Sequence, residues 1–429
     1  MRTTTYIAAL FLLALSACKT ERQQEPPTID PATIVRTPAE FEDQEAVWLI
    51  WPPFDHVEEL SNASVYLNLI ETLLAYTKVE LTVMDSQTLE IAKAILPAEV
   101  QNNPQLNLRI VPSIEIWARD MGPVFVERAD GQLAVADFNF NAWGYTDTLD
   151  ADAQVEEKYD ELVAANLGLP LVSSSLITEG GDHELNGKGT MMLVESVEMG
   201  RNPHLTKAEI EAEFSRLLGA DHFIWLKQGL HEDDHTFLGP LATEDGPAYT
   251  VITTNGHIDE FARFVDDTTV LLAEVHPDDL EDPIAQENHR RMEVNFEILQ
   301  QATDQVGRPL RIIRMPLPKT ILHTMQPGDG VYDYISTLDY EDGSQFPAGE
   351  AVATIAAASY LNFLITNGAI IGQRYYQPGM DPSVAERDEL ARSVLQAAFP
   401  QREIIMLDAL AINLGGGGIH CISKQQPRL

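Results

Sequence analysis

The stretch Leu361-Asn362-Phe363-Leu364-Ile365-Thr366-Asn367-Gly368-Ala369-Ile370-Ile371 decides the fold class, because it predicts a β-hairpin. Two apolar runs flank Asn367-Gly368, a dipeptide that favours the tight turn between antiparallel strands. A helix follows, which we expect to open at Ser383 with Glu386 in the capping-box position. Residues 403–407 then predict one short apolar strand. Hairpin, helix and strand together make one ββαβ unit.

The same order of elements recurs along the chain. Residues 261–265 and 270–273 predict a second hairpin, and a helix over about residues 286–305 and a strand at 311–314 follow it. Further copies are predicted, in chain order, by a helix at 57–76 with a strand at 79–83, a hairpin at 124–127 and 133–136, and a helix that runs to residue 218 with a strand at 223–226. Thr206 and Glu209 predict a capping box at the start of that helix, and Gly219 predicts its end. Four or five such copies predict one pseudo-symmetric α/β domain. Residues 231–250 interrupt the pattern, and their acidic, Gly- and Pro-containing sequence predicts a loop near the site.

The composition limits the choice of partners. The 429 residues include 66 acidic and 28 basic side chains, which gives a formal net charge of -38. Because phosphate binding needs clustered Lys and Arg, this balance argues against a nucleic-acid partner. It favours cationic ligands, and it equally fits a protein adapted to a salty habitat. Two cysteines are too few for a disulfide framework.

The first residues predict export from the cytoplasm. Arg2 and the apolar residues 6–15 are typical of a signal peptide and are too short to span a membrane. Leu15-Ser16-Ala17-Cys18 resembles a bacterial lipobox, in which the cysteine is lipidated and becomes the first mature residue. We therefore expect a lipoprotein signal peptide over 1–17, lipidated Cys18 with a flexible tether over 18–37, and one domain over 38–429. This predicts a lipid-anchored, extracytoplasmic protein of the bacterial cell envelope; an ordinary cleaved signal peptide is the alternative.

A single thiol near the C-terminus is the first candidate catalytic group. Gly415-Gly416-Gly417-Gly418-Ile419-His420-Cys421 places Cys421 behind four glycines. Glycine lets the main chain approach a ligand closely, so this segment indicates a nucleophile. A buried structural cysteine beside a glycine turn is the alternative.

Acidic and imidazole side chains stand just before three predicted hairpins. They are Asp120, Glu179, and the pair His257 and Asp259, each beside Gly or Pro. Equivalent positions in a repeated unit predict that they converge on one centre. The alternatives are a surface ion pair of Asp120 with Arg119, a plain turn at Glu179, and core hydrogen bonds from His257 and Asp259, which on a strand would share one face.

These segments resemble the agmatine deiminase and bacterial Porphyromonas-type peptidylarginine deiminase family, part of the guanidino-group modifying (pentein) superfamily. The matching segments, in chain order, are residues 117–123, 137–144, 179–181, 255–259, 359–363, and 415–421 with 425–427. The resemblance covers nearly all of residues 38–429. It implies a single deiminase domain, built as a five-bladed α/β propeller of ββαβ repeats around a central substrate channel. Family members often pair as homodimers, for which the sequence itself carries no signal.

The resemblance also implies a catalytic mechanism. The Cys421 thiolate would attack the guanidinium carbon. His257 would give a proton to the departing ammonia and then take one from the hydrolytic water. Glu179 would orient and charge-stabilise that imidazole. The product is a ureido group, and neither metal nor organic cofactor is needed.

Substrate binding is implied for three further residues. Asp120 and Asp259 would bind the planar guanidinium through charge-assisted hydrogen bonds, with Trp117 beside them. The motifs favour agmatine, which would become N-carbamoylputrescine, whereas the export signal is equally compatible with peptidyl-arginine. The family's Asp-Xaa-Thr element normally runs directly into its Gly-His-Xaa-Asp motif. Here Asp234-His235-Thr236 is separated from Gly256 by an insertion, which leaves open the contacts to the far end of the substrate.

Two other functions compete with this one. His231-Glu232-Asp233-Asp234-His235 is rich in metal-ligating groups and would suit a metal-dependent ureohydrolase that releases urea. That function would leave Cys421 unused. A surface protein that binds cations without catalysis is the non-enzymatic alternative, and the intact set of Cys, His and carboxylates argues against it.

Overall fold

The structure is a computed structural model that describes residues 26–429. The predicted signal peptide and Cys18 lie outside the described residues. Within the described part, no helix is both long and apolar enough to cross a membrane. Residues from the end of the predicted tether are folded: Ile34–Arg36 forms β1, which pairs with β5, and Thr28 bridges to Leu171. The ordered domain therefore begins before the predicted boundary at residue 38.

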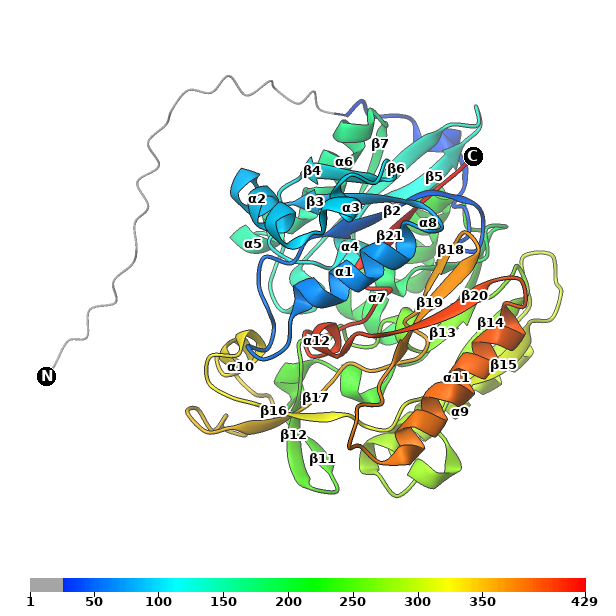
Figure 1. Cartoon of the computed structure of the whole chain (residues 1–429). Helices are drawn as coiled ribbons and strands as arrows, with labels where there is room; N and C mark the ends of the chain where they lie inside the picture. Colours follow the sequence, from blue (N-terminus) through cyan, green and yellow to red (C-terminus); the bar gives the residue numbers. More distant parts are fainter. Residues whose placement is uncertain (1–25) are drawn as a thin grey trace, which may run out of the picture.

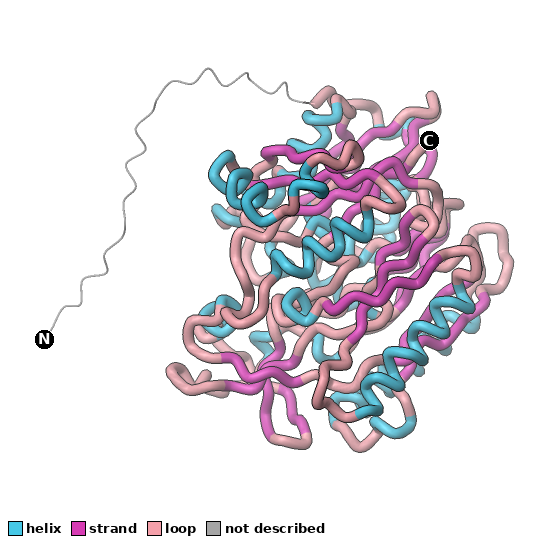
Figure 2. Tube along the Cα trace, viewed as in Figure 1, coloured by secondary structure: helices cyan, strands magenta, loops and turns pink. Residues whose placement is uncertain are grey.

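The fold is a mixed α/β arrangement of several small sheets, and one pattern recurs in five of them. An antiparallel pair of strands is followed by a helix and then by a third strand that pairs in parallel with the second. The hairpin predicted across Asn367-Gly368 is confirmed by β18 (Leu364–Thr366) and β19 (Ala369–Arg374), and α11 (Pro382–Ala398) leads to β20 (Glu403–Asp408). Figures 1 and 2 show α11 along one edge of the molecule, where it packs on β15, β19 and β20.

Three more units follow this pattern within continuous stretches of chain. Their antiparallel pairs are β5 (Val124–Arg128) with β6 (Leu133–Asn139), β8 (Glu184–Leu185) with β9 (Thr190–Val194), and β13 (Ala262–Phe264) with β14 (Thr269–Glu274). Their parallel third strands are β7 (Leu171–Ile177), β10 (His222–Leu226) and β15 (Arg311–Pro316). The helices between second and third strands are α5 (Ala151–Glu157), α6 (Tyr159–Leu167), α7 (Glu195–Arg201), α8 (Lys207–Leu218) and α9 (Pro283–Gln301).

The remaining unit joins the two ends of the domain. β2 (Gln44–Ile50) pairs antiparallel with β21 (Ser423–Pro427) and parallel with β3 (Lys78–Val83), which pairs with β4 (Leu106–Ile110). Figure 1 shows the red strand β21 beside the blue strand β2. The helices of this region are α1 (Asn62–Leu73), α2 (Ser86–Ile95) and α3 (Ala98–Gln101).

A sixth sheet departs from the predicted pattern. Residues 231–250, expected as a loop, contain two short 3-10 turns and a hairpin of β11 (Leu241–Thr243) and β12 (Gly246–Thr250). This hairpin joins β16 (Leu322–Met325) and β17 (Val352–Ile355), and α10 (Gly330–Ile335) connects those two strands. Few turn signals distinguish these short segments from the loops that flank them, so the sequence did not predict the sheet.

Two local predictions at helix ends have different outcomes. The capping box of Thr206 and Glu209 is confirmed, and α8 ends at Gly219 in the left-handed conformation. The predicted start of α11 at Ser383 is wrong, because the Asp381 side chain accepts from the Ser383 N–H and Pro382 occupies the first turn. Proline suits that position because its missing N–H would have no intrahelical partner there.

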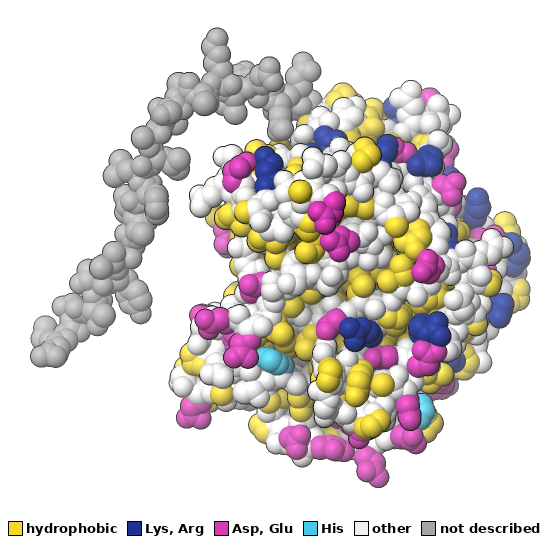
Figure 3. Space-filling model, viewed as in Figure 1, with side chains coloured by type: hydrophobic (Ala, Val, Ile, Leu, Met, Phe, Trp, Pro, Cys, Tyr) yellow, Lys and Arg dark blue, Asp and Glu magenta, His cyan; other side chains and the backbone are white. Residues whose placement is uncertain are grey.

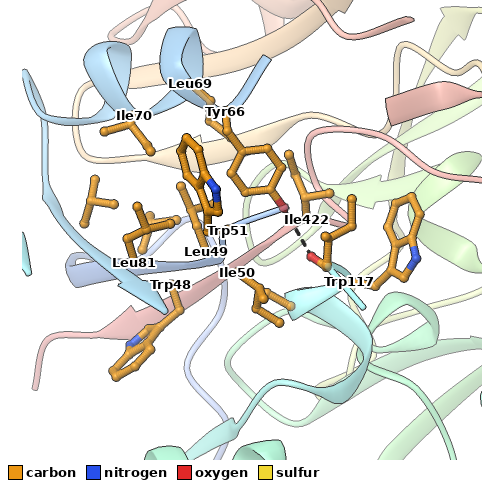
Figure 4. Packing of buried hydrophobic residues seen from close by; sticks show 14 of the residues in the cluster. Trp48, Leu49, Ile50, Trp51, Tyr66, Leu69, Ile70, Leu81, Trp117 and Ile422 are labelled. Carbon is orange, nitrogen blue, oxygen red and sulfur yellow. Dashed lines mark hydrogen bonds between the residues drawn. The ribbon is translucent and has the colours of Figure 1, made fainter. Parts of the chain in front are cut away.

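The hydrophobic core around β2 positions the segment that carries Trp117. Trp51 and Tyr66 are fully buried on the side of β2 that faces α1, and Trp48 is fully buried on the other side (Figure 4). The Tyr66 hydroxyl donates to the carbonyl of Ile116, 3.3 Å away, and so ties α1 to the segment that carries Trp117. Asp and Glu side chains are spread over the face shown in Figure 3, as the net charge requires.

Candidate active site

The thiol of Cys421 lies in the turn between α12 (Leu410–Asn413) and β21. Gly416 has a φ of +124°, and a Cβ there would collide with the carbonyl oxygen of Ile252. The turn therefore requires glycine at this position. The Cys421 side chain is buried, and its Sγ atom lies 3.0 Å from Nδ2 of Asn362. Two carboxylates flank the sulfur, Asp259 at 3.5 Å and Glu260 at 3.8 Å.

His257 lies directly before a 3-10 turn, Ile258–Glu260, which precedes the hairpin of β13 and β14 as predicted. It does not lie on a strand, which the alternative of two core hydrogen-bonding groups on one strand face had assumed. The Asp233 carboxylate fixes this backbone, because it accepts from the N–H groups of Gly256 and His257. The buried imidazole lies between two acids: its Nε2 atom is 3.2 Å from Glu179 and its Nδ1 atom is 3.6 Å from Asp120. Nδ1 has no hydrogen-bond partner among the described residues, so it is free to act on a ligand.

Charge at this imidazole follows from its neighbours. Burial lowers the pKa of His257, but the charges of Asp120 and Glu179 outweigh burial and raise that pKa to about 10. The imidazole is therefore cationic at neutral pH. Burial raises the pKa of Glu179, yet Arg201, whose Nε donates to it at 2.8 Å, and His257 lower it to about 2. The buried Arg201–Glu179–His257 chain thus holds an imidazolium as a proton donor.

Asp120 lies in the short helix α4 (Ala118–Met121) and accepts one hydrogen bond from its own ββαβ unit and one from the next unit. The indole Nε1 of Trp143 donates to it at 2.8 Å, and the N–H of Gly181 donates at 2.9 Å. Trp143 and Ala142 both have left-handed backbone, with φ of 55° and 49°, which is costly for residues other than glycine. A Cβ on Gly181 would meet both Asp120 and His257, so this glycine allows their close approach.

Asp259 is held through Oδ2, the oxygen that also lies 3.5 Å from the Cys421 sulfur. The imidazole of His420 lies with Nδ1 2.7 Å from Oδ2 of Asp259, and Asn362 donates to the same oxygen at 3.1 Å. The other oxygen, Oδ1, is buried without a partner among the described residues. Burial would raise the pKa of Asp259, but its hydrogen bond and attraction to His420 lower it. The site therefore contains an ionised carboxylate with an unused acceptor.

The protein groups around Cys421 do not by themselves favour the thiolate. Burial raises the pKa of the Cys421 thiol well above its usual range, and the charges of Asp259 and Glu260 add to this. A cation bound between these carboxylates and the sulfur would reverse the effect, because it would stabilise the thiolate.

A small inner pocket leads from the thiol to a wider cavity. Trp117, Asp120, Trp143 and Cys421 line the inner pocket. Trp117 and Trp143 also line a cavity of about 430 Å³, together with side chains from residues 54–56, 114–115 and 150–156. The two spaces share Trp117, Trp143, Ile252 and Gly415, so the Cys421 thiol lies behind the part of the cavity wall that the two indoles form.

All six predicted site residues of the domain meet at this centre: Trp117, Asp120, Glu179, His257, Asp259 and Cys421. The sequence reasoning missed the contacts of Trp143, Arg201, Glu260, Asn362 and His420. Four of these five residues lie inside or next to the quoted motif segments. Their place in the sequence was therefore the signal that could have identified them as site residues. Arg201 lies in α7, away from any motif, and no pattern in the sequence marked it.

The rival metal cluster does not assemble. His231 and Asp234 join Arg291, Glu232 accepts from Asn288, and Asp233 caps backbone N–H groups. His235 contacts the carbonyl of Trp143. Within residues 26–429, two other groups bring potential ligand atoms close together: Asp259 with Glu260 and Cys421, and Asp137 with Glu157 and Glu161.

Comparison with known proteins agrees with this geometry. The model of the Porphyromonas-type peptidyl-arginine deiminase family matches residues 36–238 and 242–427. The agmatine deiminase of Pseudomonas aeruginosa (strain LESB58) is 32% identical over 416 residues, which cover 94% of this chain and 98% of that protein. The agmatine deiminase of Pseudomonas fluorescens (strain SBW25) is 32% identical over 401 residues, 91% of this chain and 95% of that one.

The fold comparison points the same way. The solved structure of the agmatine deiminase of Enterococcus faecalis superposes with a TM-score of 0.73 at 26% identity, over 94% of this chain and 98% of that one. The predicted family resemblance is confirmed, and the chain belongs to the Porphyromonas-type peptidyl-arginine deiminase family.

Proposed function

We propose that this protein is an agmatine deiminase, which hydrolyses the guanidino group of agmatine to a ureido group and releases ammonia. One observation carries the proposal: a thiol, an imidazolium and two carboxylates surround one narrow pocket that two indoles line. The full-length similarity to agmatine deiminases supports agmatine as the substrate.

Binding of the guanidinium would use the two carboxylates. Asp120 and the unpaired Oδ1 of Asp259 accept its N–H groups in charge-assisted hydrogen bonds. The positive charge then lies beside Cys421 and lowers the pKa of its thiol, so that substrate binding itself generates the nucleophile.

The reaction proceeds in two halves. In the first, the Cys421 thiolate adds to the guanidinium carbon, and the imidazolium of His257 gives its proton to one amino group, which leaves as ammonia. The sulfur now carries a cationic thiouronium group. In the second half, water adds to the same carbon while neutral His257 takes a proton from it. The carbon–sulfur bond then breaks, the hydroxyl proton is released, and the ureido product leaves the regenerated thiolate.

Peptidyl-arginine is the second candidate substrate, and the description of the family model favours it. One experiment separates the two: agmatine and an arginine-containing peptide are offered together to the purified domain in the presence of a chelator. Ureido product from agmatine alone supports the proposal. Citrulline in the peptide would replace it, and urea that disappears with chelator would point to metal-dependent hydrolysis.

For the architecture, we propose that the five ββαβ units form a closed five-bladed propeller around the site. The support is that each unit places a site residue just before its first strand: Asp120 before β5, Glu179 before β8, Asp259 before β13, Asn362 before β18 and Cys421 before β21. An experimental structure in which the five sheets do not surround Cys421 would contradict this arrangement.

For the location, we propose a lipid anchor at Cys18 on the extracytoplasmic side of the cell envelope. The lipobox-like segment Leu15-Ser16-Ala17-Cys18 supports this. The Cys18→Ser variant should appear in the soluble fraction while the parent protein stays with the membranes. Equal fractionation of the two proteins would remove the anchor from the proposal.

A further inference from the structure

A second pocket, which we name the junction pocket, lies apart from the cavity beside the two indoles. It has a volume of about 80 Å³, and it shares no lining residue with that cavity or with the inner pocket. Its wall is formed by residues within 37–44, 119–125, 180–185 and 424–427. The wall therefore includes parts of β2 and β21, the two strands that join the ends of the domain.

Two buried cations line the junction pocket, and neither has a carboxylate within hydrogen-bond distance. Arg119 is 6% exposed, and its Nη2 atom has no hydrogen-bond partner among the described residues. The carboxylate of Glu40 stays 4.0 Å from that atom. Lys424 is equally buried, and its one hydrogen bond in the described part of the chain goes to the carbonyl of Arg119, 3.1 Å away. Two of its three N–H donors are therefore unused.

The acidic residues of the wall are committed to another partner. Glu40 and Glu184 both form ion pairs with the fully buried Arg263. Glu40 also contacts Nε2 of His420 at 2.9 Å. The two carboxylates thus offset Arg263, and neither forms a hydrogen bond to the two cations of the pocket. A buried charge without a bonded counter-charge is costly, so this wall favours an anionic ligand.

Uncharged side chains of the wall also have unused polar atoms. Nε2 of Gln425 is buried without a hydrogen-bond partner within residues 26–429, and so are Oε1 of Gln44 and Nδ1 of His183. Nε2 of Gln44 donates to the carbonyls of Glu40 and Ile365, at 2.9 and 2.8 Å, which fixes Oε1 as a free acceptor. Because buried polar groups are rarely left unpaired, four such atoms in one wall, counting Nη2 of Arg119, indicate a ligand.

We propose that the junction pocket binds one small inorganic anion, which Arg119 and Lys424 hold through charge-assisted hydrogen bonds. The site is separate from the proposed deiminase centre and does not depend on that function. An anion with its own hydroxyl, such as bicarbonate, also donates to Oε1 of Gln44, which chloride cannot do. The volume of about 80 Å³ excludes large organic anions.

The bound anion strengthens the contact between α4 and the chain that leads into β21. The N–H of Arg119 donates to the carbonyl of Cys421 at 2.9 Å, and Lys424 donates to the carbonyl of Arg119. Burial, together with the charge of Arg119, lowers the pKa of Lys424 to about 7, and a neighbouring anion would raise it again. An ion that bridges the two side chains adds a link across this junction, so we expect it to stabilise the folded domain.

The test is thermal unfolding of the protein in potassium bicarbonate, potassium chloride and potassium gluconate, at pH 8 and equal ionic strength. Equal ionic strength is needed because, at a net charge of -38, any salt stabilises the folded state by screening. Gluconate is too large for the pocket and reports that general effect. We expect bicarbonate to raise the melting temperature by about 2–4 °C above the gluconate value, with saturation, and chloride to raise it less.

Two variants and one control locate the effect. Lys424→Met removes one cation and keeps the aliphatic stem, so bicarbonate should shift its melting temperature by less than about 0.5 °C. Gln425→Glu adds a carboxylate to the same wall, so this variant should be as stable in gluconate as the parent is in bicarbonate, without a further shift. Lys93→Met removes a lysine of α2 whose side chain is 41% exposed, and it should keep the full shift of the parent.

Three results would overturn the proposal. They are equal melting temperatures in the three salts, an equal bicarbonate shift in the parent and in Lys424→Met, and a crystal structure at saturating bicarbonate with water alone in the junction pocket. If Lys424→Met does not fold, Gln425→Glu carries the comparison, and a bicarbonate shift retained in that variant rejects the site. No readout uses turnover, so a failure of the deiminase assignment leaves these results unchanged.

Discussion

The imidazole of His420 places its Nδ1 atom 2.7 Å from Oδ2 of Asp259, on the side of that carboxylate away from its free oxygen. The other nitrogen, Nε2, lies 2.9 Å from Glu40. Asp259 is thus fixed in rotation by a residue that immediately precedes the nucleophile. The carboxylate that would bind the guanidinium and the thiol that would attack it are positioned by one stretch of backbone.

Replacing His420 with Asn should therefore impair substrate binding more than folding. The shorter amide cannot reach both carboxylates, so Asp259 loses its orientation. A hydrogen bond to a charged group contributes about 1.5–3 kcal/mol, which corresponds to a fall in kcat/KM of about 10- to 100-fold. Steady-state kinetics with agmatine and a thermal melt check this. If the melting temperature falls far enough to account for the whole loss of kcat/KM, His420 acts on stability alone.

Trp143→Phe should weaken substrate binding, because it removes one hydrogen bond to Asp120 and keeps an aromatic ring in the wall of the pocket. The indole Nε1 donates to Asp120 at 2.8 Å, and Phe has no donor at that position. We expect an increase in KM for agmatine of about tenfold. Ala142→Gly provides a matched control, because it relaxes the same left-handed turn and leaves the indole in place. Parent-like KM for Trp143→Phe would mean that Asp120 needs no such donor.

Cys421→Ala should abolish turnover and leave folding largely intact. The side chain packs in a buried position and makes no hydrogen bond that the fold depends on. Loss of a nucleophile typically costs at least about 10⁴-fold in kcat. Activity assays, circular dichroism and the mass of the protein trapped with agmatine would check it. Turnover retained in Cys421→Ala would exclude a covalent intermediate on this sulfur.

Stability should fall as the pH rises from neutral toward 10, and His257 is the reason. Its folded pKa is about 10, above its ordinary value of 6.5. The stabilisation is fully present below pH 6.5 and is lost progressively as the pH rises from 6.5 through 10, because over that range the folded state keeps a proton that the unfolded chain has already released. Urea unfolding at pH 6.5, 8 and 9.5 measures this. His257→Asn should flatten the profile over that range, and an equally steep profile would assign the effect to other groups.

Gly416→Ala should destabilise the protein and inactivate it together. Its φ of +124° is unfavourable for alanine, and the added Cβ would collide with the Ile252 carbonyl. The cost in unfolding free energy should be about 1–3 kcal/mol from backbone strain, with further loss from the collision. Gly131→Ala offers a comparison, since its Cβ would meet nothing nearby although its φ is also positive. Equal losses of unfolding free energy in both variants would mean that the positive φ, and not the collision with Ile252, causes the destabilisation.

Elements with strong local signals were predictable from the sequence, and long-range contacts were not. Asn367-Gly368 predicted the hairpin correctly because the preference for this turn depends on the two residues themselves. The first strand, however, begins at Leu364 and not at Leu361, where the apolar run begins. The chain instead turns at Tyr360-Leu361, and Asn362 and Phe363 lie outside any strand, which brings the Asn362 amide to the thiol. The apolar character of Leu361 and Phe363 therefore reflects burial and not strand pairing. The motif segments predicted the residues that meet at Cys421, but not the residues that position them. Arg201 reaches Glu179 from helix α7, and nothing in the spacing of these residues along the sequence indicates that contact.

The pairing of β21 with β2 also sets an order of events during synthesis. The carboxylates and the imidazole are made earlier in the chain, and the sulfur arrives with the strand that joins the last unit to the first. A nascent chain therefore contains its imidazole and carboxylates before it contains the catalytic sulfur, and Asp259 gains its orientation only when His420 follows. Chemical competence arises in a single step, when β21 docks, so a chain that has not yet joined its two ends has no catalytic activity.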